Sequence, residues 1–139
     1  MDAAKVRSFA YNLMKARFLL DNYMIHHSKE EDTIKSNPWK LQIWHKDEET
    51  KKGQLRNLSK DDSIQNRLVH LLSMFEVSFT AKQRKNYLFY CLFYLMREEV
   101  LDVGGYEKFV EDLADRYFVK VYLDGSKLNT INTPVPGSF

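Results

Sequence analysis

The sequence contains little cysteine, glycine or proline, and these shortages exclude several classes of protein. Its 139 residues include one Cys, five Gly and three Pro. A single cysteine forms no disulfide within the chain, so we expect a protein of a reducing compartment, the cytoplasm. So few glycines and prolines supply too few turns for a loop-dominated β-sandwich.

Long hydrophobic runs and a dominant charge are also missing. The longest apolar run, Tyr87–Met96, has ten residues, and a helix needs about 20 to span a bilayer. Residues 1–7 lack the apolar stretch of a signal peptide. The net charge of +2 does not by itself indicate nucleic acid binding. We therefore expect a chain with no membrane segment.

The residues that are abundant predict a mainly α fold. Hydrophobic residues make up 44% of the chain and aromatic residues 14%, enough to fill a core. Apolar residues recur at three- and four-residue steps in residues 3–25, 62–76 and 106–117, which predicts amphipathic helices. We expect a compact bundle of about four helices around a central apolar helix, and the sequence allows a short two-strand element.

The central helix is predicted to begin at Thr80, which resembles a capping box with Gln83. Residues 88–96 are apolar all the way round, so this helix should be buried on most sides. Its most buried side chains are expected to be Leu88, Cys91, Leu92 and Leu95.

The neighbouring helix ends carry weaker signals. Ser59 and Asp62 resemble a capping box that starts the second helix. Gly104 and Gly105 indicate the end of the connection before the last helix. Residues 118–123 are rich in β-forming residues and allow a short strand after it.

The segment between the first two helices is more polar. Residues 26–60 predict a mobile excursion, with a turn at Asn37-Pro38. Residues 39–43 alternate apolar and polar side chains like a half-buried strand, and Trp44 breaks the alternation. Together these patterns predict one helical domain over residues 1–125 and an extended linker over residues 126–139.

Catalytic and metal-binding patterns are weak throughout. No two histidines lie at the helical spacing of a zinc enzyme, and no cysteine pair supports them; the histidines are His26, His27, His45 and His70. No glycine-rich phosphate loop and no nucleophile elbow is present. Cys91 lies among apolar residues, so we interpret it as a core thiol. We expect no enzymatic activity, no metal and no cofactor.

Two groups of residues are candidates for binding surfaces. Lys82, Arg84 and Lys85 fall near the start of the third predicted helix, where free N–H groups and the helix dipole also favour an anion such as a DNA phosphate. The alternative is a solvated helix start whose charge is offset by Glu76. Trp39 and Trp44 are candidates for contact with a partner protein, because tryptophan is enriched at interface hot spots.

Two segments resemble a known family. Arg17–Ile25 is similar to an Arg-Phe-Leu-x-Asp-x-Tyr-x-Ile pattern, and Leu72–Phe79 resembles a Gln-Ser-Met-x-x-Val-Ser-Phe-like stretch. Both patterns occur in the helical middle region of GmrSD-type modification-dependent restriction endonucleases, a family of bacterial defence proteins. The resemblance covers residues 3 to about 120.

The resemblance implies a helical, non-catalytic region. In that family the region joins an N-terminal ParB-like nucleotide-hydrolysing domain to a C-terminal HNH-type nuclease domain. The Asp-Gly-Gln-Gln-Arg motif of the first domain and the Asn-Ser-x-x-His motif of the second are absent from this chain. No catalytic residue is therefore carried over.

These observations leave two functional hypotheses. One is a non-catalytic module of a restriction or phage-defence protein, which positions or regulates catalytic domains and contacts DNA phosphates. The other is a protein-interaction adaptor unrelated to nucleic acid, which uses the Trp39–Trp44 segment. The basic start of the third predicted helix favours the first hypothesis, and the near-neutral charge and the tryptophan pair favour the second.

The DNA hypothesis predicts weak, non-specific and strongly salt-dependent binding of duplex DNA. Replacing Lys82, Arg84 and Lys85 by Gln should weaken binding, and the log–log salt slope should fall by about one for each phosphate that is no longer neutralised. Fluorescence anisotropy with a labelled duplex at several salt concentrations measures both quantities. Absence of binding by the unmodified chain at low salt would favour the adaptor hypothesis.

Overall fold

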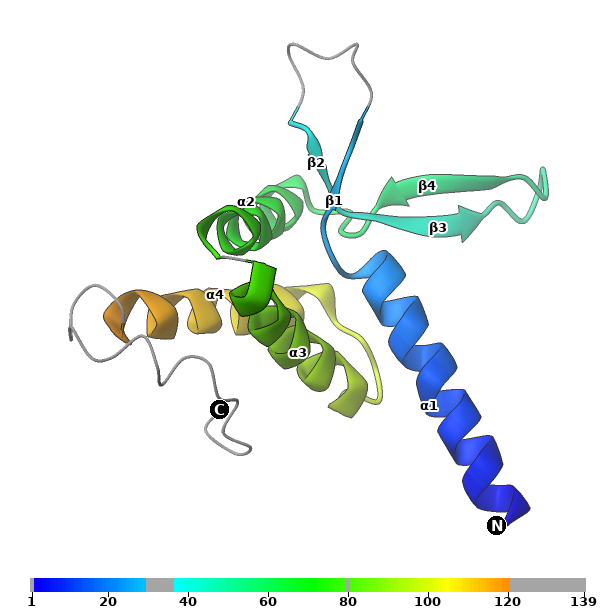
Figure 1. Cartoon of the computed structure of the whole chain (residues 1–139). Coiled ribbons are helices and arrows are strands. Elements are labelled where there is room, and N and C mark those ends of the chain that lie inside the picture. The colour runs from blue at the N-terminus through cyan, green and yellow to red at the C-terminus, as the bar shows by residue number, and fades with distance from the viewer. Residues whose placement is uncertain (1, 30–36, 80, 121–139) are drawn as a thin grey trace.

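The described residues form four helices and two small antiparallel sheets (Figure 1). The computed structural model describes residues 2–29, 37–79 and 81–120, without the side chains of residues 81–85. The helices are α1 (Ala3–Asn22), α2 (Asp62–Ser78), α3 (Ala81–Arg97) and α4 (Val103–Phe118). The strands are β1 (His26–His27), β2 (Trp39–Lys40), β3 (Gln42–Lys46) and β4 (Gly53–Asn57). The predicted mainly α fold with a short strand element is confirmed.

The start of α2 is set by an aspartate. The Asp61 carboxylate accepts hydrogen bonds from the backbone N–H groups of Ser63 and Ile64, at 2.8 and 3.4 Å. The predicted capping box with Ser59 is therefore wrong, although the helix begins at Asp62 as expected. Ser59 lies before the helix, where its hydroxyl accepts a hydrogen bond from the N–H of the capping residue Asp61.

The start of α4 lies three residues before the predicted one. Asp102 caps this helix by accepting from the N–H groups of Gly104 and Gly105, so both glycines belong to the first turn and not to the connection. A Cβ atom at Gly105 would lie 3.2 Å from the Tyr94 hydroxyl. Glycine at this position therefore allows the start of α4 to approach α3 closely.

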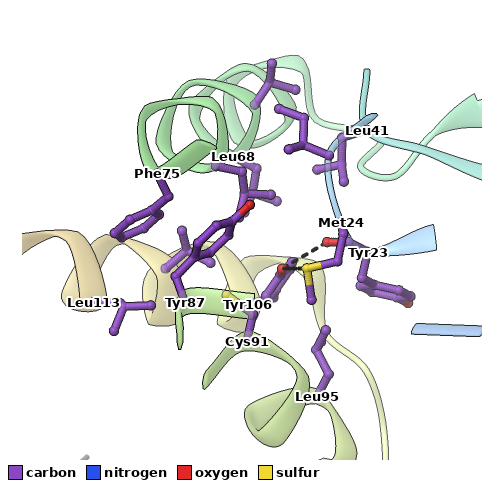
Figure 2. Close-up of a cluster of buried hydrophobic side chains, with 14 of the residues drawn as sticks. Tyr23, Met24, Leu41, Leu68, Phe75, Tyr87, Cys91, Leu95, Tyr106 and Leu113 are labelled. Atoms are coloured by element: carbon purple, nitrogen blue, oxygen red, sulfur yellow. Dashed lines mark hydrogen bonds between the residues drawn. The ribbon is translucent and has the colours of Figure 1, made fainter. Parts of the chain in front are cut away.

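The end of α1 comes three residues earlier than predicted. The helix stops at Asn22, and Tyr23, Met24 and Ile25 are buried in the segment that follows. The Tyr106 hydroxyl, from α4, donates to the carbonyl of Tyr23 at 2.9 Å. Figure 2 shows this bond at the centre of the buried cluster. Because the carbonyl at the helix end is satisfied by a side chain, the chain can turn into the core there.

The core lies between the C-terminal part of α1, the buried sides of α2 and α3, and α4 (Figure 2). The most extensive helix–helix contact joins α2 to α4. At one end of the core, aromatic rings from three helices gather, with the Phe75 and Tyr87 ring centroids 5.1 Å apart and those of Phe79 and Tyr117 4.7 Å apart. Such aromatic pairs add to the stability gained from burial.

Burial of α3 is one-sided, which corrects the expectation that it is buried on most sides. Cys91 and Leu95 are fully buried as predicted. Leu88 and Leu92 are only partly buried. On the opposite side Phe89 and Phe93 are exposed, with their rings stacked at a centroid distance of 6.1 Å. The described elements that pack on α3 therefore leave one of its apolar faces uncovered.

The last described turn also differs from prediction. Residues 118–120 do not form a strand, because α4 continues through Phe118 and residues 119–120 form a wider π turn. Residues 121–123 of the predicted strand and the predicted linker, residues 126–139, lie outside the described residues. None of the helices in the described part of the chain is long and apolar enough to cross a membrane.

Leu95 and Leu92 provide a test of this one-sided core. Replacing the fully buried Leu95 by Ala should lower the free energy of unfolding by about 2–5 kcal/mol, the range for large aliphatic core residues. The same change at Leu92 should cost less, because part of its side chain already contacts water. Urea unfolding followed by circular dichroism measures both. Equal destabilisation at the two positions would contradict the arrangement of α3.

Candidate interaction surface

The structure places the histidines and the cysteine that the sequence put forward for metal binding or catalysis in four different elements. No group of three or more His, Cys, Asp or Glu side chains there lies in a position to hold a metal ion. His26 and His27 lie in β1, His45 in β3 and His70 in α2, all four exposed. Burial raises the pKa of Cys91 to about 12, so this thiol is protonated at neutral pH and is a poor nucleophile.

The structure separates the residues that the sequence put forward for binding. Trp39 is half-buried, packs against the core and meets His27 edge-to-face at a centroid distance of 5.0 Å. The expectation that its side chain is exposed is therefore wrong, while a role in partner contact stays a prediction. Trp44 is 62% exposed, as expected. The side chains of Lys82, Arg84 and Lys85 lie outside the described residues, although the α3 backbone that carries them is described.

Trp44 belongs to a regular hairpin, where the sequence had predicted an irregular excursion. Strands β3 and β4 pair antiparallel from Gln42 opposite Asn57 to Lys46 opposite Gly53. Trp44 lies directly opposite Leu55, which is 57% exposed. Directly opposed residues share one face of a sheet. The hairpin therefore presents an apolar pair to solvent on that face.

A glycine keeps the indole in place. A Cβ atom at Gly53 would overlap the six-membered ring of Trp44. The ring therefore lies over the backbone of Gly53 on the neighbouring strand, two register pairs beyond its own partner, Leu55. This close approach needs a residue without a side chain, which explains why β4 begins with Gly.

The connection between the two strands is ordered by local hydrogen bonds. The Asp47 carboxylate accepts from the N–H groups of Glu49 and Thr50, at 2.8 and 3.3 Å. These two bonds stabilise the charged form and lower the pKa of Asp47. Lys51 completes the turn with a positive φ of 55°, and the N–H of Asp47 then donates to Lys52.

A buried glutamine clamps the base of the hairpin to α2. The side-chain amide of Gln65 donates to the carbonyl of Leu41 at 2.8 Å and accepts from the N–H of Ser59 at 2.9 Å. The N–H of Leu58 also donates to Leu41. Leu41 and Ser59 flank the two strands, so one side chain ties the start and the end of the hairpin to the same helix. Both polar ends of the amide are satisfied.

A second attachment joins the hairpin to α1. The Asn22 side chain, at the last position of α1, accepts a hydrogen bond from the N–H of Trp44 at 3.3 Å and donates to the carbonyl of Phe18 at 2.8 Å. The backbone of Trp44 is therefore held by the helix while its indole remains in solvent. In Figure 1 the hairpin extends away from the helices on the side of α1.

Sequence reasoning did not identify Leu55 or Gln65. Leu55 falls in a charged stretch that predicted no strand, so its pairing with Trp44 required the hairpin register. The position of Gln65 in the sequence could have indicated its buried role. It lies three residues before Leu68 and seven before Leu72, on the apolar stripe of α2, where a polar side chain needs buried partners.

Comparison of the chain with protein-family models, with curated proteins and with solved structures finds no match. The hairpin and the exposed apolar faces are therefore interpreted from their own geometry.

The clamp predicts a specific loss of stability when Gln65 is replaced by Met. Methionine fills a similar volume but cannot accept from the buried N–H of Ser59 or donate to the carbonyl of Leu41. The loss of these two bonds should cost about 1–3 kcal/mol. Asn66→Met is the control, since Asn66 is exposed on the same helix, and should change stability by less than about 0.5 kcal/mol. Urea unfolding monitored by tryptophan fluorescence compares the two. Indistinguishable stabilities would show that the clamp contributes nothing.

Proposed function

We propose that this chain is a non-catalytic interaction module, in which the helices hold the β3–β4 hairpin out as a contact for a partner protein. The observation that carries the proposal is the exposed Trp44–Leu55 pair on a hairpin whose base is fixed at both ends. A large aromatic side chain kept in solvent by an ordered backbone loses little conformational freedom when a partner covers it.

The charges around this pair indicate the chemistry of the partner. Strands β3 and β4 carry no acidic residue. Lys46 shares the face of Trp44, two positions along β3, whereas Arg56 lies opposite Ile43 on the other face. An apolar side chain next to a carboxylate would match a surface in which Lys46 lies beside Trp44 and Leu55. The partner is therefore proposed to be a protein segment with apolar and acidic residues.

The resemblance to restriction proteins gives this module a more specific context. Of the residues that carry it, Leu19, Tyr23 and Phe79 are core residues, so these positions serve the fold. In this version of the proposal, the partner is the ParB-like or the nuclease part of the same defence system, and the module positions it. The coding sequence around this chain tests that context, because a neighbouring His-containing nuclease domain is expected.

Removing the apolar pair should abolish partner binding without unfolding the chain. We expect Trp44→Ala combined with Leu55→Ser to raise the Kd for a partner encoded beside this chain by at least about 30-fold, the loss of about 2 kcal/mol at a hot spot. Co-expression of the chain with each neighbouring gene product, followed by calorimetric titration of any complex, measures this change.

Val100 provides the matched control. It is a large exposed apolar residue outside the hairpin, so Val100→Ser should leave the Kd unchanged. If the unmodified chain, the Trp44→Ala/Leu55→Ser variant and the Val100→Ser variant all bind the partner equally well, the hairpin is not the contact. Unchanged helical circular dichroism in both variants confirms that the fold is intact.

A further inference from the structure

The N-terminal half of α1 extends beyond the rest of the structure. Figure 1 shows this end of the helix pointing away from the other elements. Leu19 is the only buried residue of α1, and residues 2–14 are all exposed. The Lys15 side chain donates to the carbonyl of Met96, close to the end of α3, so α1 continues for about three turns past that point.

The exposed half of α1 gains little stability from packing against the rest of the chain. Short helices are marginal in water without packing of an apolar face. The exposed half nevertheless carries large apolar side chains along one side, Val6, Phe9 and Leu13. Their three- and four-residue spacing continues the line of Ala16 and Leu20, which are partly buried in the body of the protein. The face that packs in the core therefore runs on into solvent.

This stripe is complementary to itself when two helices run antiparallel. We propose that residues 2–17 pair with the same residues of a second copy of the chain, about a two-fold axis between Phe9 and Ala10. In this register the numbers of two residues that lie opposite each other always sum to 19. Val6 meets the partner's Leu13, and Phe9 meets the partner's Ala10, so that a large side chain faces a small one.

The charges select the same arrangement. Asp2 lies opposite the partner's Arg17, and the two-fold axis repeats this ion pair at the other end. Arg17 already pairs with Asp21 at 2.8 Å, but its guanidinium has five N–H donors and can serve both carboxylates. Lys5, Arg7 and Lys15 lie level with the partner's Met14, Asn12 and Ala4, so none of these cations lies level with a cation of the partner.

Other arrangements of the two helices are less favourable. Parallel pairing in register would place each cation of the segment opposite its own copy, which is repulsive. Moving the antiparallel register by seven residues toward the C-terminus would require Leu20, which already packs against the core. Moving it by seven residues toward the N-terminus would leave Leu13 opposite no described residue. The antiparallel pair centred between Phe9 and Ala10 places its apolar contacts at Val6, Phe9, Ala10 and Leu13, which are all exposed in the described structure.

The size of the contact indicates a weak dimer. The paired segments are about 24 Å long, and two single helices bury less area than the ~1,200–2,000 Å² of a standard stable interface. We therefore expect a monomer–dimer equilibrium with a Kd in the micromolar range. Sedimentation velocity of the full chain from about 1 µM to about 1 mM should show the mass rising from one copy to two.

Phe9 and Tyr11 are a matched pair for testing this surface. They are 69% and 65% exposed and lie on different sides of the same helix. Phe9→Glu should raise the dimer Kd by at least about 30-fold, whereas Tyr11→Glu makes the same change of charge and should leave it nearly unchanged. A monomer at every concentration, or equal effects of the two substitutions, would overturn the proposal.

Cysteine cross-linking tests the direction of the helices and does not depend on those variants. A mixture of Val6→Cys and Leu13→Cys chains should form a disulfide between unlike chains under mild oxidation. Chains carrying Val6→Cys alone should not, because the two sulfurs would be about 10 Å apart along the axis. The native Cys91 is buried and should not react. Efficient cross-linking of Val6→Cys chains to each other would contradict the antiparallel pair.

Discussion

The hydrogen bond from the Tyr106 hydroxyl to the carbonyl of Tyr23 is the contact on which the arrangement of the helices depends. It joins the end of α1 to the first turns of α4, 83 positions apart in the sequence. Tyr106 is fully buried, so an unmade bond would leave two polar groups without water. The same ring stacks on Tyr94 of α3 and meets Tyr23 edge-to-face. Burial raises the pKa of Tyr106, which keeps the hydroxyl able to donate.

Gln65 applies the same principle to the hairpin. In both places a buried side chain from a helix satisfies backbone groups of a segment that leaves the core. Buried polar contacts of this kind are directional, whereas apolar packing is not. They therefore fix the angle at which α1 and the hairpin extend from the body. The α2–α4 contact is held by apolar packing and by the ion pair between Arg67 and the buried Glu107, at 3.0 Å.

The two proposed surfaces are separate and have different requirements. The hairpin face, formed by Trp44 and Leu55, needs an ordered β-strand register and a partner with complementary charge. The apolar stripe of α1, formed by Val6, Phe9 and Leu13, needs only a second copy of the same helix. A dimer formed through α1 would carry two hairpins, and a partner able to contact both would bind more tightly than to either alone. Neither surface depends on the residues at the start of α3.

The sequence by itself determined the helices, because the periodicity of apolar residues is a local property. It identified α1, α2 and the buried positions Cys91 and Leu95, and it showed that Trp44 stands outside the regular pattern. It could not determine the end of α1, since Tyr23 and Met24 fit the helical stripe and the contact of Tyr106 with the Tyr23 carbonyl comes from the distant α4.

Tertiary structure also decided which apolar residues remain exposed. Phe9 and Leu19 belong to one helix, yet only Leu19 has α3 within reach, because α3 ends near Lys15. Leu55 became part of a surface only when strand pairing placed it opposite Trp44. A side chain's exposure depends on neighbours distant in the sequence, and that is why the candidate surfaces had to come from the fold.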